Sequence, residues 1–287
     1  MPVELLAQIF QYSMDTEIIG PEDLMIICKY WYQATMENSG LWNHINLYGL
    51  AVRRYRTPIA YVGVYIRHSR LQLLRVTLRV DDKNPNSTSI CQALAATIHR
   101  WSEADITIAG MGYLQAGYEF LHAPAPSLHS LRVSMFSTWL EKLDLTQILT
   151  DTRSLSNLKI CRGDHARPAI TLPVMYGSTV KYLELKNFKS SSALPIIHQL
   201  PHIVHLRLFQ LEAGTDPRNT PSIPISLPFL TTLVLIRIQS EELKHFLDHT
   251  FMPNLREVHL STLCPNSQSN EAILSRLTAE GCKISYV

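Results

Sequence analysis

The chain has 287 residues, of which 46% are hydrophobic and 17% charged, so it holds enough apolar material for a sizeable core in one or two domains. A formal net charge of +2 is too small to indicate a nucleic-acid partner, and no apolar run approaches the roughly 18 residues needed to span a membrane. Five scattered cysteines without a C-x-x-C pair argue against a disulfide framework or a zinc module, and they favour reduced thiols in the cytoplasm or the nucleus.

The opening stretch MPVELLAQIFQY predicts a helix with apolar groups on more than one side. Pro2 suits the first helical turn, because its missing N–H would have had no partner within the helix. Leu5, Leu6, Ile9 and Phe10 are too many bulky groups for one face of a terminal helix. Part of this helix is therefore expected to contact something besides its own core.

A second helical segment begins after Gly20, where Pro21 opens the run PEDLMIICKYWYQATMEN. Cys28 and Trp31 lie at helical spacing in this run, and the segment ends with LWNHINL (Leu41–Leu47).

Three landmarks of the first fifty residues resemble an F-box: P-x-E-L-L-x-x-I-F, then C-x-x-W, then L-W-x-x-I. The family pattern usually begins Leu-Pro, whereas this chain has Met1-Pro2, a substitution that conserves volume and polarity. The resemblance implies an F-box domain over residues 1–50 that docks on the Skp-type adaptor of a cullin–RING ubiquitin ligase. The residues that it implies for adaptor binding are Pro2, Leu5, Leu6, Ile9, Phe10, Cys28 and Trp31. Spacing leaves open which of them contact the adaptor and which the module's own core. The alternative is a helix that caps the repeats that follow.

Residues 51–70 are interpreted as a linker helix with a solvated arginine face. The stretch Ala51–Val80 contains seven arginines and no acidic residue. Phosphate binding is the alternative interpretation of such a basic stretch.

Residues 71–287 contain a repeat in which an apolar residue is followed, three positions on, by apolar-x-apolar. Its second apolar position marks each copy, at Leu131, Leu158, Leu183, Leu206, Leu233 and Val258, with spacings of 27, 25, 23, 27 and 25 residues. Weaker copies fit at Leu74, Ile106 and Ile284. The step matches the leucine-rich repeat, at about 20–29 residues. The position five residues after each marker is mostly apolar where that family carries Asn or Cys, so the repeats are degenerate.

The predicted fold class is therefore α+β, with a small helical F-box followed by an α/β leucine-rich-repeat solenoid of stacked parallel strands. The alternative for residues 71–287 is an ordinary α/β domain. Helical spacing is found in the return segments Ser89–Trp101, Thr138–Leu149, Ser240–His249 and Asn270–Glu280. The segment Glu212–Pro228 holds four prolines, which exclude a regular helix and predict a long loop of open role.

If the marker residues point inward, the residues between them form an outward strand face. The candidate target-binding residues on this face are Arg132, Lys159, Tyr182, Lys186, Arg207 and Phe209. An acidic or phosphorylated segment of a target would suit Lys159, Lys186 and Arg207. The alternative is that these are ordinary exposed strand residues.

No nucleophile elbow, phosphate-binding loop or dinucleotide-binding motif occurs in the chain. His245 and His249 have zinc-ligand spacing, and His198, His202 and His205 form a second group, but neither has an evident complete ligand set.

We therefore expect a non-catalytic protein without a cofactor or metal. Its expected role is substrate recognition in a Skp–cullin–F-box E3 ubiquitin ligase, binding a target protein of unknown identity. The first alternative is a leucine-rich-repeat scaffold that acts outside ubiquitination. The second is a hydrolase or metal enzyme on an α/β domain.

Overall fold

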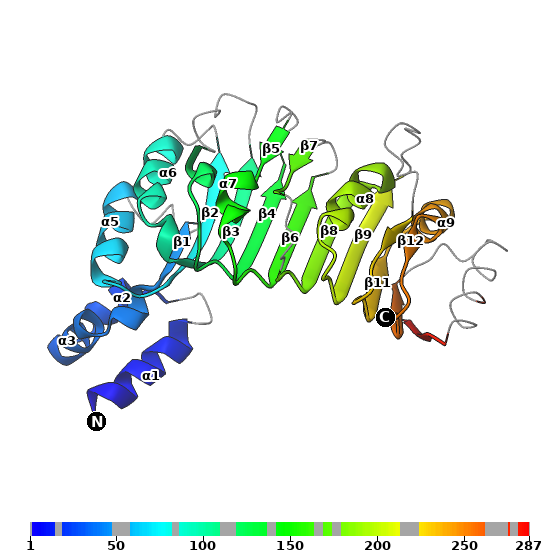
Figure 1. The fold of residues 1–287 in the computed structure, drawn as a ribbon. Helices are drawn as coiled ribbons and strands as arrows, with labels where there is room; N and C mark the ends of the chain where they lie inside the picture. Colours follow the sequence, from blue (N-terminus) through cyan, green and yellow to red (C-terminus); the bar gives the residue numbers. More distant parts are fainter. Residues whose placement is uncertain are drawn as a thin grey trace.

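The fold is a mixed α/β arrangement built around one large parallel sheet, which agrees with the predicted α+β class at this coarse level (Figure 1). The computed structural model describes residues 2–14, 19–47, 58–81, 86–109, 119–136, 142–163, 169–173, 179–212, 224–261, 275 and 281–286. Eight α-helices occur in these residues: α1 (Val3–Met14), α2 (Pro21–Met25), α3 (Lys29–Glu37), α5 (Pro58–His68), α6 (Ser87–Ala95), α7 (Thr146–Thr150), α8 (Ser190–His198) and α9 (Ser240–Asp248). None of these helices is both long and apolar enough to span a bilayer.

The large sheet contains ten strands that lie side by side in chain order, and every neighbouring pair is parallel. They are β1 (His44–Leu47), β2 (Leu74–Asp81), β3 (Trp101–Ala109), β4 (Ser130–Met135), β6 (Asn157–Arg162), β8 (Tyr182–Lys189), β9 (His205–Glu212), β11 (Thr232–Ile236), β13 (Glu257–Ser261) and β14 (Lys283–Tyr286). Parallel neighbours require a crossover between them, and Figure 1 shows helices α5 to α9 along one side of the row of strands.

Two short sheets lie outside this row. One pairs β5 (Lys142–Asp144) with β7 (Ala169–Thr171), and the other pairs β10 (Ile225–Ser226) with β12 (Thr250–Phe251). The described segments also contain three 3₁₀ helices: η1 (Ser39–Trp42), η2 (Ile98–Arg100) and η4 (Glu119–His122).

The six predicted marker residues align across the sheet, from Leu131 paired with Leu158 to Leu233 paired with Val258, and all six are buried. Ile284 aligns with Val258 as predicted. The two weaker copies at the other end are shifted by two residues, because Ala104 rather than Ile106 aligns with Leu131. A two-residue slip leaves the same side chains facing the core, so the hydrophobic pattern alone does not distinguish the two registers.

The segment LWNHINL ends in a strand of the large sheet. Residues His44–Leu47 form β1, which pairs with β2 in the register His44 to Arg75. The helix predicted over residues 51–70 is α5, Pro58–His68, which lies between these strands in the chain; residues 48–57 lie outside the described residues. One cluster of buried residues runs from Leu6 to Cys282, so the N-terminal helices and the sheet share a hydrophobic core.

The predicted return helices are found unevenly. Ser240–His249 is confirmed as α9, and Ser89–Trp101 covers most of α6 and all of η2 before Trp101 starts β3. The helical spacing of Thr138–Leu149 corresponds to a helix only towards its end, because the described part holds strand β5 before the five-residue helix α7. The helix predicted over Asn270–Glu280 lies outside the described residues except for Ser275. Of Glu212–Pro228, residues 213–223 also lie outside them, and the described remainder contains β10.

Candidate functional site

Helix α1 has two stripes of apolar side chains, one of which is buried while the other is exposed. Leu6 and Phe10, four residues apart, are each 1% exposed and belong to the core. Leu5 and Ile9 form the neighbouring stripe and are 51% and 50% exposed, and Tyr12 continues that stripe at 79%. The excess of apolar side chains on α1 therefore lies on the molecular surface rather than in the core.

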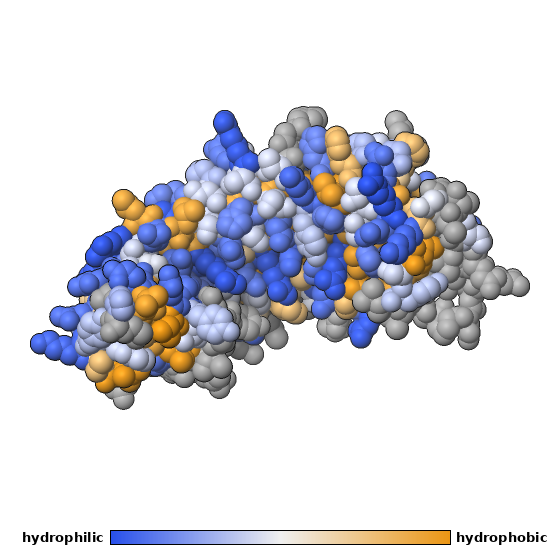
Figure 2. Space-filling view, turned by 90° about the horizontal axis from the view of Figure 1, so that it is seen from below, coloured by the Kyte–Doolittle hydropathy of each residue, from blue (hydrophilic) through white to orange (hydrophobic). Residues whose placement is uncertain are grey.

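Helices α2 and α3 and the turn between them expose further large apolar side chains. Pro21 and Leu24 are buried, whereas Ile26 and Ile27 are exposed at the end of the short helix α2. We define the N-terminal apolar surface as Leu5, Ile9, Tyr12, Ile26, Ile27, Tyr30 and Tyr32, all of which are exposed. Figure 2 shows hydrophobic side chains gathered at this end of the molecule, whereas the strand region beside it is mostly hydrophilic.

The residues predicted for adaptor binding divide between surface and core. Pro2, Leu5, Ile9 and Cys28 are exposed. Trp31 is half-buried, with its ring centroid 4.7 Å from that of Phe10. Leu6 and Phe10 are enclosed by the chain's own core, so in this structure they are not available to a partner. Sequence reasoning missed Tyr12, Ile26, Ile27, Tyr30 and Tyr32, although the seven-residue interval from Leu5 to Tyr12 would have identified Tyr12.

Polar contacts fix the N-terminal helices to α5. The hydroxyl of Tyr65 on α5 donates to Oε2 of Glu22 on α2 at 2.9 Å, and Trp42 packs edge-on against Tyr65 with ring centroids 5.2 Å apart. The indole N–H of Trp42 donates to the carbonyl of Thr35 on α3 at 2.9 Å. Burial and the nearby Tyr61 and Glu22 raise the pKa of Tyr65 well above its usual value. These contacts join α2, α3 and α5 through one partly buried network.

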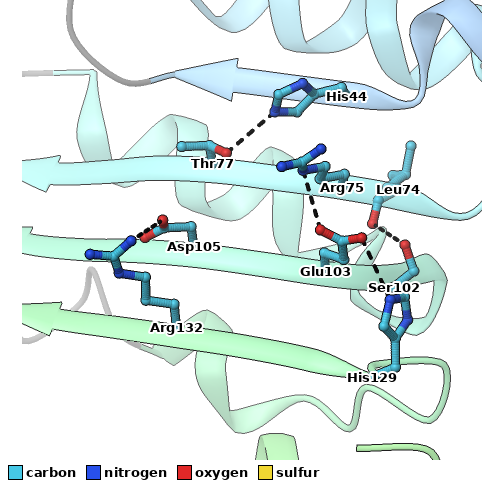
Figure 3. A network of polar contacts seen from close by, with 9 residues as sticks. All are labelled: His44, Leu74, Arg75, Thr77, Ser102, Glu103, Asp105, His129 and Arg132. Atoms are coloured by element: carbon cyan, nitrogen blue, oxygen red, sulfur yellow. Dashed lines mark hydrogen bonds and ion pairs between the residues drawn. The ribbon is translucent and has the colours of Figure 1, made fainter. Parts of the chain in front are cut away.

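The outward face of strands β1 to β4 carries charges that neutralise one another (Figure 3). Nε of Arg75 lies 3.2 Å from Oε2 of Glu103, whose Oε1 lies 3.5 Å from Nε2 of His129. Arg132 lies 3.7 Å from Asp105. Arg79 pairs with Asp81 at 3.6 Å. We call this the paired half of the strand face; its pairs are half-exposed, so each contributes little stability.

A shallow depression of roughly 650 Å³ crosses the paired half and reaches strand β6. Among its lining residues are Thr77, Asp105, Arg132, Ser134 and Lys159, with Phe136 on one side. Phe136 is 57% exposed, unlike the buried Phe188, Leu211 and Ile238 at the same position of later repeats. Charged side chains of both signs and several hydroxyl groups line the depression, which suits a polar segment.

The outward face of strands β6 to β11 has a different character. Lys159 lies over the ring of Tyr182, with 5.4 Å from Nζ to the centroid, and Lys186 lies over Phe209 at 4.8 Å. Arg237, directly after β11, approaches Phe209 at 5.7 Å. We call the set Lys159, Tyr182, Glu184, Lys186, Arg207, Phe209 and Arg237 the basic half of the strand face.

Glu184 is the acidic member of the basic half, and its carboxylate already has two partners within the chain. It lies 3.8 Å from Arg207 and accepts a hydrogen bond from the hydroxyl of Tyr182 at 3.0 Å. Burial, followed by the charge of Glu184, raises the pKa of Tyr182. The two halves therefore differ in net charge although they share one sheet.

The predicted target-binding residues do not all lie in one environment. Lys159, Tyr182, Lys186, Arg207 and Phe209 form the basic half, whereas Arg132 belongs to the paired half. The outward positions two residues after Arg132 and Lys159 are less exposed than alternation predicts, since Ser134 and Cys161 are buried, and burial raises the pKa of the Cys161 thiol. Arg237 was missed, because it lies after the strand rather than on an outward strand position.

The histidine groups form no metal site among the described residues, where no group of three or more His, Cys, Asp or Glu side chains could hold an ion. The rings of His245 and His249 lie 4.3 Å apart, and Nδ1 of His249 donates to the carbonyl oxygen of His245 at 2.8 Å. His202 packs instead on Phe229 with ring centroids 5.1 Å apart.

Neither a scan against protein-family models nor a search of curated protein sequences finds a match to this chain.

Proposed function

We propose that the chain is the substrate-recognition subunit of a Skp–cullin–F-box E3 ubiquitin ligase, acting in the cytoplasm or the nucleus. In this proposal helices α1 to α3 form an F-box that docks on the Skp-type adaptor. The parallel sheet with its crossover segments is a degenerate leucine-rich-repeat solenoid, and its strand face binds the target protein.

The observation that carries the proposal is the N-terminal apolar surface. Exposed apolar side chains concentrated at one end of a protein are typical of a protein-binding site. Here they accompany the three sequence landmarks that resemble an F-box, and Leu5 and Ile9 belong to the first of these landmarks. A helical adaptor would bury them and remove the unfavourable contact of Leu5, Ile9 and Ile26 with water.

The proposed mechanism is proximity rather than chemistry on this chain. One end of the molecule holds the adaptor and the strand face holds a target, so target lysines reach a high effective concentration near the ubiquitin-carrying enzyme. The contacts of Tyr65 with Glu22 and Trp42 support a fixed distance between the two ends, because they join the N-terminal helices to α5 and thereby to the sheet.

The test is co-purification of the full chain with the Skp-type adaptor, comparing the wild type with the double variant Leu5→Asp, Ile9→Asp. Two carboxylates placed in an apolar interface without partners should abolish the complex. The matched control is Leu71→Asp, Phe251→Asp, which makes the same chemical change at exposed residues outside the N-terminal apolar surface.

A complex that survives in the control and is lost in the α1 variant, with equal thermal stability of the two proteins, would support the proposal. Absence of a complex with the wild type would remove the ligase assignment and leave a repeat scaffold with another partner. Retention of the complex in the α1 variant would show that the adaptor binds elsewhere.

A further inference from the structure

The basic half of the strand face has more positive charge than its surroundings neutralise. Lys159, Lys186 and Arg237 form no ion pair with any carboxylate whose side chain the structure describes; their contacts are with the aromatic rings of Tyr182 and Phe209. The paired half shows the opposite, since Arg75, Arg79 and Arg132 each have a carboxylate partner. Among the cations named for the two halves, those without a described acidic partner therefore all lie in the basic half, where only Arg207 has one, Glu184.

Two of these cations approach the same ring from different strands. Lys186 projects from β8 and Arg237 follows β11, while Phe209 lies on β9 between them, in register with Lys186 and with Ile236. Two like charges near one ring repel each other. An anion bound beside Phe209 would remove that repulsion and keep both cation–aromatic contacts.

The backbone is strained along this edge of the strand face. Asn187 on β8, Gln210 on β9 and Arg237 directly after β11 have φ angles of 59°, 54° and 53°, and they occupy equivalent positions in neighbouring repeats. Left-handed backbone is unfavourable for residues other than glycine, and such strain gathers at ligand-binding sites. At Arg237 this conformation accompanies a side chain that turns back over Phe209.

We propose that Lys186, Phe209 and Arg237 form a phosphate clamp that binds a phosphorylated serine or threonine of a target protein, with Lys159 and Arg207 contacting acidic groups beside it. The assignment of this ligand to a ubiquitination target rests on the proposed function, but phosphate recognition itself does not.

A phosphomonoester fits this clamp better than a carboxylate. Near neutral pH it carries close to two negative charges and three acceptor oxygens, so one group can contact Lys186 and Arg237 together. A carboxylate has a single charge and two oxygens, which one guanidinium can satisfy alone. The ring of Phe209 supplies an apolar wall for the methylene or methyl carbon that carries the phosphate.

The experiment titrates the ¹⁵N-labelled full chain with three peptides that differ only in the central residue: acetyl-Gly-Ala-X-Ala-Gly-amide, where X is phosphoserine, serine or glutamate. Chemical-shift changes report the affinity and the residues involved. We expect the phosphoserine peptide to bind at least about tenfold tighter than the other two, since a charged hydrogen bond contributes that much or more. The changes should centre on Lys186, Phe209 and Arg237.

The variant Arg237→Gly separates binding from folding, because glycine relieves the left-handed strain while removing one cation. Its affinity for the phosphoserine peptide should fall about tenfold, and its Tm should stay equal to or above that of the wild type. The matched control is Arg70→Gly, which removes the same charge in the turn after α5. The backbone of Arg70 is also in the left-handed region, with φ of 50°. It should bind the peptide as the wild type does.

Three outcomes would overturn the inference. They are no shift with the phosphoserine peptide, equal affinity for the glutamate peptide, and tighter binding of a twelve-nucleotide single-stranded DNA that Arg237→Gly abolishes. If the phosphoserine peptide does not bind but the complex with the adaptor forms, the phosphate clamp is ruled out and the ligase proposal stands. Phosphopeptide binding without any adaptor complex would keep the clamp and remove the ligase.

Discussion

The N-terminal helices and the strand sheet share one hydrophobic core but present opposite surfaces to water. Buried and outward positions alternate along much of the sheet, so that the buried markers Leu183 and Leu206 are followed by the charged residues Glu184 and Arg207. Helix α1 does not alternate in this way, because a second apolar stripe lies beside the buried one. The sheet thus uses its apolar residues for its own stability, whereas the helices expose more of them than their core needs.

The comparison is tested most strongly within α1 itself. Phe10→Ala should lower the free energy of unfolding by about 3–5 kcal/mol, because it removes a buried ring and leaves a cavity against Trp31. The exposed Ile9→Ala should cost less than about 1 kcal/mol, as surface substitutions do. Urea denaturation measures both values. Similar losses at the two positions would contradict the division of α1 into a core stripe and a surface stripe.

The packing of α2 against α5 should depend on the hydroxyl of Tyr65. Tyr65→Phe removes the donor to Glu22 and should cost about 1–3 kcal/mol, because a partly buried carboxylate loses its hydrogen bond. Tyr12→Phe, at an exposed tyrosine, is the matched control and should change stability little. An equal effect of the two substitutions in thermal denaturation would remove the role assigned to this contact.

The raised pKa values of Tyr61 and Tyr65 predict a loss of stability at high pH. Above about pH 10 these tyrosines ionise in the unfolded chain but stay protonated in the folded one, so the unfolded state binds fewer protons and the free energy of unfolding falls as pH rises. Denaturation curves from pH 8 to 11 measure this slope, and Tyr65→Phe should make it shallower. An unchanged slope in that variant would show that other groups control alkaline unfolding.

Glycine at a strained position of the strand face should raise the free energy of unfolding. Arg237→Gly is expected to raise the free energy of unfolding by roughly 1 kcal/mol, because glycine adopts positive φ without a steric penalty although it loses more entropy on folding. Arg237→Ala relieves no strain and serves as the comparison. A glycine variant less stable than the alanine variant would show that the entropy glycine loses on folding outweighs the backbone strain it relieves at this site.

The smallest expected effect concerns the paired half. Arg75→Gln removes the ion pair with Glu103, and because both side chains are half-exposed it should cost only about 0.2–1 kcal/mol. This small loss should shrink further in 0.5 M salt, which screens exposed charges. A loss above 2 kcal/mol would mean that the network of Arg75, Glu103 and His129 is a structural element rather than a solvated surface.

Much of the sheet could be predicted from the chain because its repeat is local. The spacing of Leu131, Leu158 and the later markers predicted the strands and their order, and alternation predicted that Lys159 and Arg207 lie on the outward face. The prediction was less accurate where the repeat weakens. Leu74 and Ile106 were placed two residues out of register, and the return segment ending at Leu149 has helical spacing although its described part holds a strand.

The candidate surfaces also combine features that follow from a local pattern of residues with features that depend on distant contacts. The period of the apolar side chains along the chain specifies which strands stack and which residues alternate outward. The folded molecule adds which stripe of α1 is buried, that His44–Leu47 joins the sheet, and that Arg237 returns over Phe209. Those three features depend on contacts between segments far apart in the chain, and a local pattern of residues carries no information about such contacts.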